Sequence, residues 1–90
     1  MTTIILDIAT LFSKDAFHQA ICNALSLPPY YGSNLDALFD CLSDISSDTQ
    51  LILQHAASLE ENLGAYGCGI QQVLQAAAQN NPHFSFVLEN

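Results

Sequence analysis

Three short apolar runs divide the chain, and each has the length of a β-strand. The runs are Ile4–Leu6, Leu51–Leu53 and Phe84–Leu88. The first two show no alternation of apolar and polar residues, which is typical of strands that are covered on both faces. The gaps between the runs are long enough for the crossovers that parallel neighbours require. The pattern therefore predicts a small, mostly parallel sheet.

Apolar residues at helical spacing predict two helices in the first gap. The first helix stops before Pro28 and Pro29, because proline cannot continue a helix. The second helix begins after Ser33 or Asn34, since either residue type can serve as the N-cap. The two apolar faces comprise Ala16, Phe17, Ala20, Ile21, Ala24 and Leu25 in the first helix, and Leu35, Leu38, Phe39, Leu42 and Ile45 in the second.

Two more helices are expected in the second gap. The sequence Ser58-Leu59-Glu60-Glu61 predicts a capping box for a short helix that Gly64 ends. Gly67 and Gly69 would then loosen the entrance to the last helix, and Pro82 lies beyond its end. The predicted order is strand, helix, helix, strand, helix, helix, strand. The apolar face of the last helix is formed by Ile70, Val73, Leu74 and Ala77.

Composition favours one folded domain over residues 1–90. Half of the 90 residues are hydrophobic and 11% are charged, against about 25% charged in an average globular chain. Such a chain can bury a real core, and disorder is not expected. Residues 1–12 contain no basic residue, and Ile4–Leu6 is short for a signal segment of about 7 to 15 apolar residues. We therefore expect the protein to stay in the cytoplasm.

The charge balance excludes several kinds of partner. Nine acidic residues face one basic residue, Lys14, and the net charge is -8. Affinity for nucleic acid comes largely from Lys and Arg side chains, so nucleic-acid binding is excluded. The same deficit argues against anionic membranes, and no apolar run approaches the roughly 18 residues of a spanning helix. We expect a soluble protein with neither kind of partner.

The three cysteines do not form a recognisable site. Cys22, Cys41 and Cys68 are odd in number and widely spaced, which fits neither a disulfide framework nor a zinc pattern. We interpret them as small buried hydrophobes.

The histidines form no catalytic motif with these thiols. His18 and Cys22 are four residues apart on one predicted helix, which supplies two metal ligands at most. We interpret His18 as a residue at the edge of the core, His55 as a loop residue between the second strand and a helix, and His83 as a surface residue. We therefore expect no enzymatic activity, no metal and no cofactor.

Asp36, Asp40 and Asp44 fall on one stripe of the second predicted helix. Each pair of like charges four residues apart costs a helix about 0.2 to 0.5 kcal/mol, and no Lys or Arg is nearby in the sequence. The positive end of the helix dipole stabilises the charge of Asp36, whereas Asp40 and Asp44 lie too far along the helix to be stabilised in this way. Four of the nine acids lie between Asp36 and Asp48. The stripe is either a simple solvated face or a surface that a partner neutralises.

Aromatic residues beside the acids favour the second interpretation. Tyr30 and Tyr31 precede the helix, and Phe39 lies at the edge of its apolar face. Rigid rings next to charges are typical of protein interfaces. A partner for this surface should be basic, and the commonest basic grooves inside cells hold nucleic-acid phosphates. Composition thus predicts a basic protein partner and makes phosphate mimicry plausible, but it does not identify that partner.

The segment 27–42, with the sequence LPPYYGSNLDALFDCL, resembles the central segment of the barstar family of bacterial ribonuclease inhibitors. Its L-P-x-Y-Y-G-x-N-L-D-A-L core is long and specific. Weaker similarity continues in the first strand, in Val73-Leu74-Gln75 and in the last strand, and so covers essentially the whole chain. The resemblance implies an α/β fold of three layers, with a three-stranded parallel sheet packed with about four helices.

The resemblance also implies a function and roles for individual residues. The family inhibits small, basic, barnase-like ribonucleases of extracellular type by plugging their active sites. On that basis Asp40 stands in for a substrate phosphate, and Asp36 pairs with a neighbouring basic residue. Tyr30 stacks on the catalytic histidine of the enzyme, and Asn34 supplies hydrogen bonds. Phe39 occupies a position where the family usually has tryptophan.

Two departures from the family pattern bear on the partner. Gln71 is neutral where the prototype has a glutamate, and residues 43–50 lack an expected glycine and tryptophan. The leading hypothesis is a monomeric inhibitor of, or immunity factor against, a basic ribonuclease or ribonuclease toxin. The alternative is a module of the same fold that regulates another basic protein, not a nuclease. The predicted contact residues are Tyr30, Asn34, Asp36, Phe39, Asp40, Asp44 and Gln71.

Overall fold

The strands and the α-helices follow one another in the predicted order along the chain. The computed structural model describes residues 1–28 and 31–89. The strands pair in parallel in the order β1-β2-β3, and Ile4 of the first lies opposite Leu51 of the second. The elements are β1 (Thr2–Asp7), the short 3-10 helix η1 (Ile8–Thr10), α1 (Lys14–Leu25), α2 (Leu35–Ser43), β2 (Thr49–Gln54), α3 (Ser58–Leu63), α4 (Ala65–Asn80) and β3 (Phe84–Leu88).

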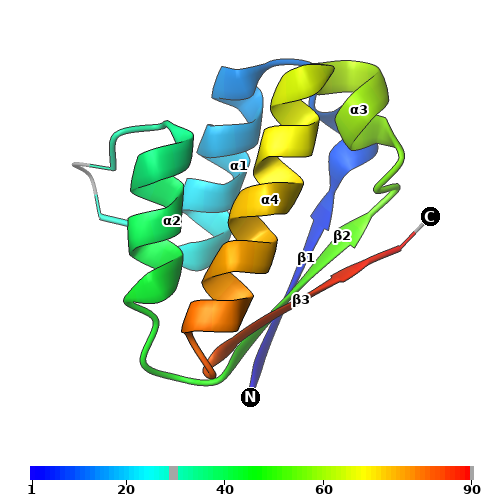
Figure 1. Ribbon diagram of the computed structural model, residues 1–90. Helices are drawn as coiled ribbons and strands as arrows, with labels where there is room; N and C mark the ends of the chain where they lie inside the picture. Colours follow the sequence, from blue (N-terminus) through cyan, green and yellow to red (C-terminus); the bar gives the residue numbers. More distant parts are fainter. Residues whose placement is uncertain (29–30, 90) are drawn as a thin grey trace.

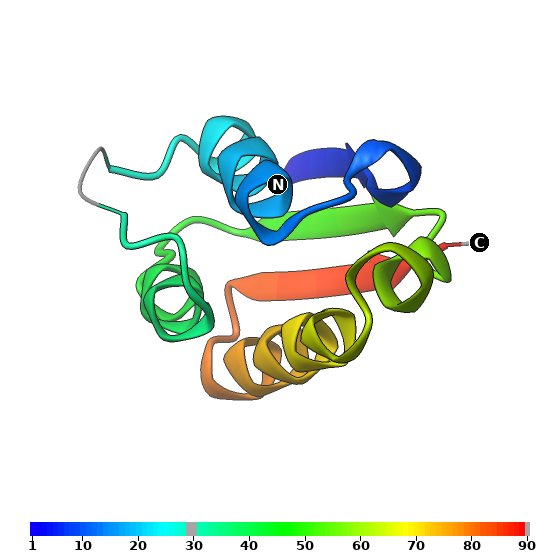
Figure 2. The same ribbon diagram turned by 90° about the horizontal axis from the view of Figure 1, so that it is seen from above.

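The four α-helices lie on one side of the sheet (Figure 1). Helix α1 packs on β1, α4 packs on β3, and α2 packs chiefly on α4. Helix α2 lies farthest from the strands in Figure 1, and Figure 2 shows it at the left, beside α4. The layers are therefore the sheet, then α1 and α4, then α2. The predicted α/β fold of three layers, with a three-stranded parallel sheet and four helices, is confirmed.

The other face of the sheet is open, so the prediction that the first two strands are covered on both faces is wrong. Ile5 is 57% exposed and Val87 is 37% exposed, whereas Leu6, Leu51 and Phe84 on the helical side are buried. The run of apolar residues reflects β-propensity, which favours β-branched side chains in a strand whether or not both faces are covered. Single exposed apolar residues are common on protein surfaces.

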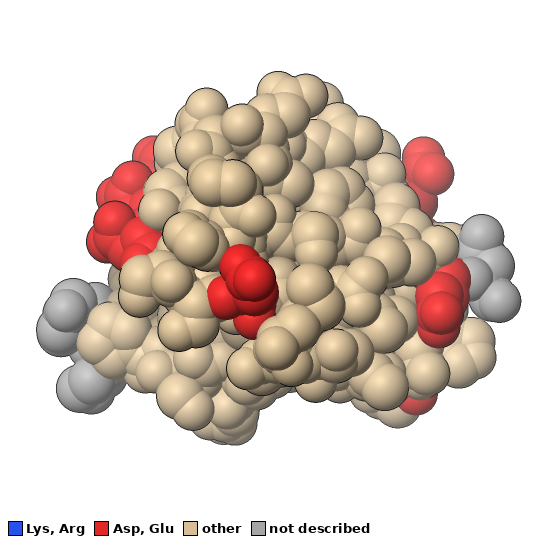
Figure 3. Space-filling model, turned by 90° about the horizontal axis from the view of Figure 1, so that it is seen from below, with Lys and Arg blue, Asp and Glu red and all other residues tan. Residues whose placement is uncertain are grey.

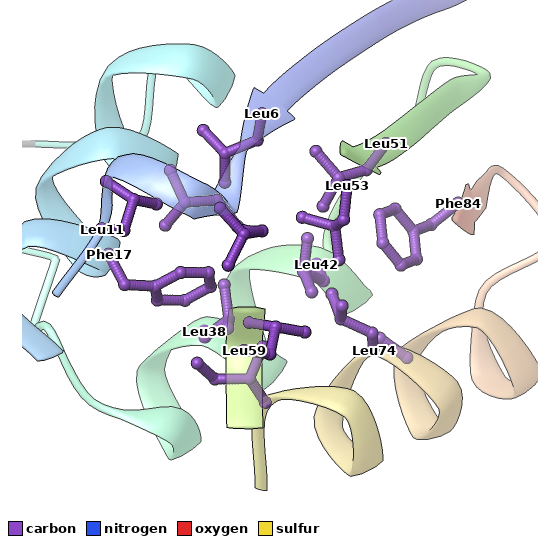
Figure 4. Packing of buried hydrophobic residues seen from close by; sticks show 14 residues of the cluster. Leu6, Leu11, Phe17, Leu38, Leu42, Leu51, Leu53, Leu59, Leu74 and Phe84 are labelled. Carbon is purple, nitrogen blue, oxygen red and sulfur yellow. The ribbon is translucent and has the colours of Figure 1, made fainter. Parts of the chain in front are cut away.

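The core lies between the sheet and the helices (Figure 4). Phe17 from α1, Leu38 from α2 and Leu74 from α4 are fully buried against Leu51 and Leu53 of β2. Burying a side chain of this size contributes about 1.5 to 3 kcal/mol. The buried cluster contains Leu6, Ile8, Leu11, Phe17, Ile21, Leu38, Leu42, Leu51, Leu53, Leu59, Ile70, Leu74, Ala77 and Phe84.

Helix α1 ends before the prolines, as predicted. Ser13 caps its start, and its Oγ accepts a hydrogen bond of 3.1 Å from the backbone N–H of Ala16. Ser26 ends the helix in the left-handed region, with φ 53°. Pro28 therefore lies beyond an end that is already formed, and Pro29 lies outside the described residues.

The capping box predicted at Ser58 is absent. Ser58 is the first helical residue of α3, and Ala57 occupies the N-cap position with a helical backbone (φ -59°, ψ -26°). A capping side chain needs an extended backbone at the N-cap. Here the turn at His55 enters the helix directly, and the Ser58 N–H donates to the His55 carbonyl at 2.9 Å. The predicted end of α3 is confirmed, since Gly64 follows its last residue with φ 59°.

Gly67 and Gly69 lie inside α4 rather than at a loose entrance to it. A Cβ atom on Gly67 would lie 2.2 Å from the carbonyl oxygen of Leu59, and one on Gly69 would lie 2.9 Å from Cδ1 of Leu35. The absence of these side chains allows α3 and α2 to pack closely on α4. The glycines thus serve tertiary packing, which the local sequence pattern does not show.

Candidate functional site

The acidic stripe lies on α2, and Asn34 fixes where this helix begins. The Asn34 side chain is the N-cap, and its Oδ1 accepts a hydrogen bond of 2.8 Å from the Ala37 N–H. Ser33, the other candidate cap, has φ 51° and precedes the helix. Asp36 follows in the first turn and Asp40 in the next turn. Asp44 forms the C-cap, and all three acids are exposed.

Asp40 lies between two surface hollows. The larger hollow, of about 570 Å³, separates α2 from α4, and Asp36 and Asp40 contribute to its wall. The second, of about 340 Å³, is lined by Asp40 and Asp44 together with Leu27, Pro28 and Cys41. The acidic ridge, defined as Asp36, Asp40 and Asp44, therefore borders both hollows. The remaining lining of the larger hollow is Leu35, Phe39, Gly69, Gln72, Val73 and Ala76.

No Lys or Arg side chain of this protein neutralises the ridge. Lys14 is the single such residue in the sequence, and its Nζ lies 4.9 Å from the centroid of the Tyr66 ring. The carboxylate–histidine pairs found within residues 1–28 and 31–89 involve Asp7 and Asp48, neither of which is on α2. Figure 3 shows acidic side chains at the edge where α2 lies, in the middle of the face and at the opposite edge, and no basic side chain on that face. The ridge is thus an unneutralised patch of negative charge.

Buried leucines and hydrogen bonds at its C-terminal end hold α2 in place. Leu38 and Leu42 are fully buried. The side-chain amide of buried Asn81 donates to the carbonyl oxygens of Leu42 and Ile45, each at 2.9 Å. These bonds join the end of α2 to the end of α4 and satisfy carbonyl groups that a helix end leaves without partners. The ridge is therefore presented on a fixed element.

The other predicted contact residues are distributed around this ridge. Phe39 is half-buried and lines the larger hollow together with Asp36 and Asp40. Tyr30 lies outside the described residues. Gln71 is half-buried on α4, and the α4 glutamine that lines the hollow is its neighbour Gln72. The structure thus brings Asp36, Phe39 and Asp40 together at one hollow and does not place Gln71 in its lining.

Asn34 uses part of its hydrogen-bonding capacity within the protein. Its Oδ1 accepts from Ala37, and its Nδ2 donates to the Gly32 carbonyl at 3.2 Å. A side-chain amide offers two donors and two acceptor lone pairs. One donor and one acceptor site therefore remain for a partner.

A buried histidine near this surface has contacts that the sequence does not reveal. His18 is 1% exposed. Its Nδ1 lies 2.6 Å from the Tyr31 hydroxyl, and its Nε2 lies 2.5 Å from the Tyr66 hydroxyl. Burial lowers the pKa of His18 and raises the pKa of both tyrosines. The helical pattern places His18 at the edge of the core, but no sequence spacing relates it to two tyrosines from other elements.

The cysteines differ in exposure. Cys22 and Cys41 are half-buried, but Cys68 is exposed, so the prediction that all three are buried is wrong. Cys68 lies on the solvent side of α4, where a small side chain is tolerated without burial. Burial, and then the Asp44 and Asp40 carboxylates, raise the pKa of the Cys41 thiol. A raised pKa makes this thiol a weak nucleophile at neutral pH.

His83 lies at the surface, as predicted, and His55 is exposed in the turn between β2 and α3. Nδ1 of His55 lies 2.9 Å from Asp7, and Nδ1 of His83 lies 2.9 Å from Asp48. Residues 1–28 and 31–89 contain no group of three or more His, Cys, Asp or Glu side chains arranged to hold a metal ion. Over the same residues, no helix combines the length and apolarity needed to cross a bilayer.

The fold and the ridge define a small acidic α/β protein that presents carboxylates on a fixed helix beside a surface hollow. Residues 1–89 match the family model described as Barstar (barnase inhibitor). A protein of Bacillus subtilis (strain 168) named "Putative ribonuclease inhibitor YrdF" is 31% identical over 91 residues, which cover 99% of this chain and 100% of that protein. The chain belongs to the barstar family, whose model is described as a barnase inhibitor.

Proposed function

We propose that this protein inhibits a basic, barnase-like ribonuclease or a ribonuclease toxin by inserting the acidic ridge of α2 into its active site. The observation that carries this proposal is the position of Asp40. Its carboxylate is exposed, lies between two hollows and has no Lys or Arg partner within the protein. Membership of the barstar family supports the same conclusion.

The proposed mechanism is the replacement of a substrate phosphate by a carboxylate. A ribonuclease active site holds cationic side chains that bind phosphate, and a carboxylate accepts charge-assisted hydrogen bonds from the same groups. Asp36 lies one helical turn, about 5.4 Å along the axis, from Asp40 and would pair with a second cation. Complementary charge would also speed the encounter of the two proteins.

The remaining contact residues would surround these charges. Tyr30 would stack on the catalytic histidine, and Phe39 would offer an aromatic surface at the hollow. Asn34 would use its free donor and acceptor, and Asp44 and Gln71 would contribute at the periphery. Fully desolvated groups at the centre of an interface carry most of its binding energy. We therefore assign the largest share of the binding energy to Asp40.

The same reasoning covers the setting in which the protein acts. An inhibitor of this kind protects the RNA of the cell that makes the enzyme, so we infer that it acts in the cytoplasm. We also infer that it acts as a monomer, because one ridge on one chain suffices to fill one active site. It needs no catalytic activity of its own for this role.

The test is a titration of RNA cleavage by a barnase-like ribonuclease with the wild-type protein, Asp40→Asn and Glu61→Gln. Each variant removes one negative charge, but Glu61 lies on α3, at a distance from α2 (Figure 1). We expect stoichiometric inhibition by the wild-type protein and by Glu61→Gln. Removing one partner of a buried charge pair costs about 2 to 5 kcal/mol, a range taken partly from the barnase–barstar complex itself. Asp40→Asn should therefore bind at least about 30-fold more weakly.

Equal inhibition by Asp40→Asn and the wild-type protein would contradict the proposed role of Asp40. A second candidate function would gain support if the wild-type protein gave no inhibition. Gln71 is neutral, and the α4 side of the larger hollow consists of Gly69, Gln72, Val73 and Ala76. This neutral side favours a different basic partner, not a nuclease, that needs fewer acidic contacts.

A further inference from the structure

One buried asparagine joins the turn after α4 to the end of α2. Asn81 follows the last residue of α4 and is 5% exposed. Its side-chain amide donates to the carbonyl oxygens of Leu42 and Ile45 at 2.9 Å and of Ser43 at 3.4 Å. Its Oδ1 accepts a hydrogen bond of 2.9 Å from the His83 N–H. Both polar atoms of this side chain are thereby satisfied, and its donor bonds all lead to residues at or just after the end of α2.

Helix α2 depends on α4 for its position. It packs chiefly on α4, and the two helices lie side by side and run in the same direction (Figure 1). Apolar contacts are non-directional, so the buried leucines hold α2 against α4 without fixing the place of its last turn. A hydrogen bond requires its donor and acceptor within a narrow range of distance and angle. The bonds of Asn81 therefore set where the last turn of α2 lies relative to α4.

The larger hollow lies between two points at which α2 and α4 are held together. Near the start of both helices, a Cβ atom on Gly69 would lie 2.9 Å from Cδ1 of Leu35, so the helices approach closely there. At their other ends, Asn81 connects them. Asp36 is next to the first point, whereas Asp40 lies one turn nearer to the second. A displacement of the last turn would therefore move Asp40 more than Asp36.

We propose that Asn81 is a positioning residue for the acidic ridge, because its hydrogen bonds fix the C-terminal half of α2 and thereby the place of the Asp40 carboxylate beside the hollow. A group that contributes to binding must be held within about 0.5 Å of its productive position by the residues that support it. Asn81 acts without touching the partner, since its side chain is buried. The inference rests on the proposed function, in which Asp40 carries the largest share of the binding energy.

Asn81→Ala and Asn62→Ala form a matched pair of variants. Each removes a side-chain amide that donates to a backbone carbonyl of another element, but Asn62 donates to Ile8 at 3.2 Å and joins α3 to η1, away from α2 (Figure 1). One net hydrogen bond corresponds to a change in an equilibrium constant of about 2- to 10-fold. We expect Asn81→Ala to raise Kd for a barnase-like ribonuclease by that factor, and Asn62→Ala to leave Kd within about twofold of the wild-type value. Equal Kd values for the two variants would overturn the positioning role.

Urea unfolding checks that each variant is folded under the conditions of the binding assay. Asn81→Ser is a milder change, because its hydroxyl can still donate one hydrogen bond. We expect it to raise Kd less than Asn81→Ala does. If Asn81→Ala does not fold, Asn81→Ser takes its place in the comparison with Asn62→Ala, and a Kd equal to that of Asn62→Ala would overturn the positioning role.

Combination with variants of the ridge shows whether Asn81 acts through Asp40. In an Asp40→Asn background, Asn81→Ala should raise Kd by less than about twofold, because the carboxylate that it misplaces is already absent. In an Asp36→Asn background, it should raise Kd by nearly the same factor as in the wild-type protein. Non-additive effects of this kind are expected for residues that act together and not for independent sites. An equal rise of Kd in both backgrounds would indicate a general loss of structure and would overturn the positioning role.

A measurement in the free protein separates this inference from the proposed function. The Asp44 N–H donates to the carbonyl oxygens of Asp40 and Cys41 at 3.2 Å and 3.3 Å, so its hydrogen exchange reports the order of the last turn of α2. We expect faster exchange at this amide in Asn81→Ala than in Asn62→Ala, with no ribonuclease present. If the wild-type protein inhibits no ribonuclease, the proposed function fails, but this difference still supports the hold of Asn81 on α2. Equal exchange in the two variants would overturn that hold.

Discussion

Asp36 and Asp40 are one turn apart on α2, but they relate differently to the helix that carries them. Asp36 lies in the first turn, where the positive end of the helix dipole stabilises an anion. Asp40 lies past the middle of this nine-residue helix, four residues from Asp36 and from Asp44, and like charges at that spacing repel one another. We assign the largest share of the binding energy to Asp40. Its carboxylate is therefore expected to destabilise the free protein.

This difference predicts opposite effects of two equivalent substitutions on stability. Asp40→Asn should raise the free energy of unfolding by about 0.4 to 1 kcal/mol, because it removes two repulsive pairs. Asp36→Asn should lower it by less than about 1 kcal/mol, because the lost interaction with the helix N-terminus is partly offset by the removal of one repulsive pair. Urea unfolding at low ionic strength measures both. A loss of stability in Asp40→Asn would show that its carboxylate also stabilises the fold.

The buried His18 predicts a pH dependence of stability on the acid side of neutrality. Burial lowers the pKa of His18 in the folded state below the ordinary histidine value of 6.5. Below pH 6.5 the unfolded chain therefore binds a proton that the folded protein excludes, so stability is complete above this pH and falls as the pH decreases. The slope from one proton is at most about 1.4 kcal/mol per pH unit.

Urea unfolding between pH 7.5 and pH 5, with His18→Gln as the comparison, measures this effect. His55 and His83 are unchanged in the variant, so their contribution cancels in the difference between the two proteins. We expect the free energy of unfolding to vary less with pH in His18→Gln than in the wild-type protein. Parallel profiles would show that another group causes the loss of stability.

At the scale of elements, the sequence predicts what depends on local patterns and misses what depends on tertiary contacts. Apolar spacing was sufficient for the order of strands and helices, and the Asn34 cap follows from its side chain. The capping role of Ser58 was wrong because the preceding turn, rather than the tetrapeptide, determines how α3 starts. The open face at Ile5 was missed because β-propensity and burial favour the same residue types.

The candidate site shows the same division between local and tertiary information. The acidic stripe is a periodic feature of one helix, so Asp36, Asp40 and Asp44 could be placed on one face from the sequence. The hollow beside it requires α4 to pack against α2, and its lining by Gln72 rather than Gln71 depends on the rotation of α4. These features become visible only when both helices are in place.

Gly67 and Gly69 allow a test of packing between elements. A Cβ atom on Gly67 would meet the backbone oxygen of Leu59 at 2.2 Å, whereas one on Gly69 would meet the terminal Cδ1 of the Leu35 side chain at 2.9 Å. Backbone cannot move aside as a flexible side chain can. Gly67→Ala should therefore destabilise the protein by about 3 kcal/mol through overpacking. For Gly69→Ala, the gain of about 1 kcal/mol in helix propensity should offset most of the strain.

Thermal or urea unfolding of the two variants checks this prediction, and circular dichroism confirms that each retains its helices. A similar small effect for both would mean that α3 moves away from α4 at little cost. A large loss of stability in both variants would mean that the Leu35 side chain is held as firmly as the backbone of α3.

At the scale of the whole molecule, the net charge of -8 acts on folding and on binding in opposite directions. Acidic groups that repel one another destabilise the compact state, so added salt should stabilise the free protein by screening that repulsion. The same field attracts a basic partner, and salt weakens this attraction. The two effects can therefore be separated by varying ionic strength.

The association rate with a basic ribonuclease should fall by about 10-fold or more from low to high ionic strength, since steering adds a factor of about 10 to 1,000. Stopped-flow mixing over a salt series measures the rate. Asp40→Asn and Glu61→Gln reduce the negative charge equally. If the association rates of the two variants depend equally on ionic strength, the overall charge steers the partner. A weaker dependence of the association rate on ionic strength for Asp40→Asn alone would show that steering depends on the ridge. We expect the second result, because salt-dependent steering is strongest for charges that face the partner, and Glu61 lies on α3, away from the ridge (Figure 1).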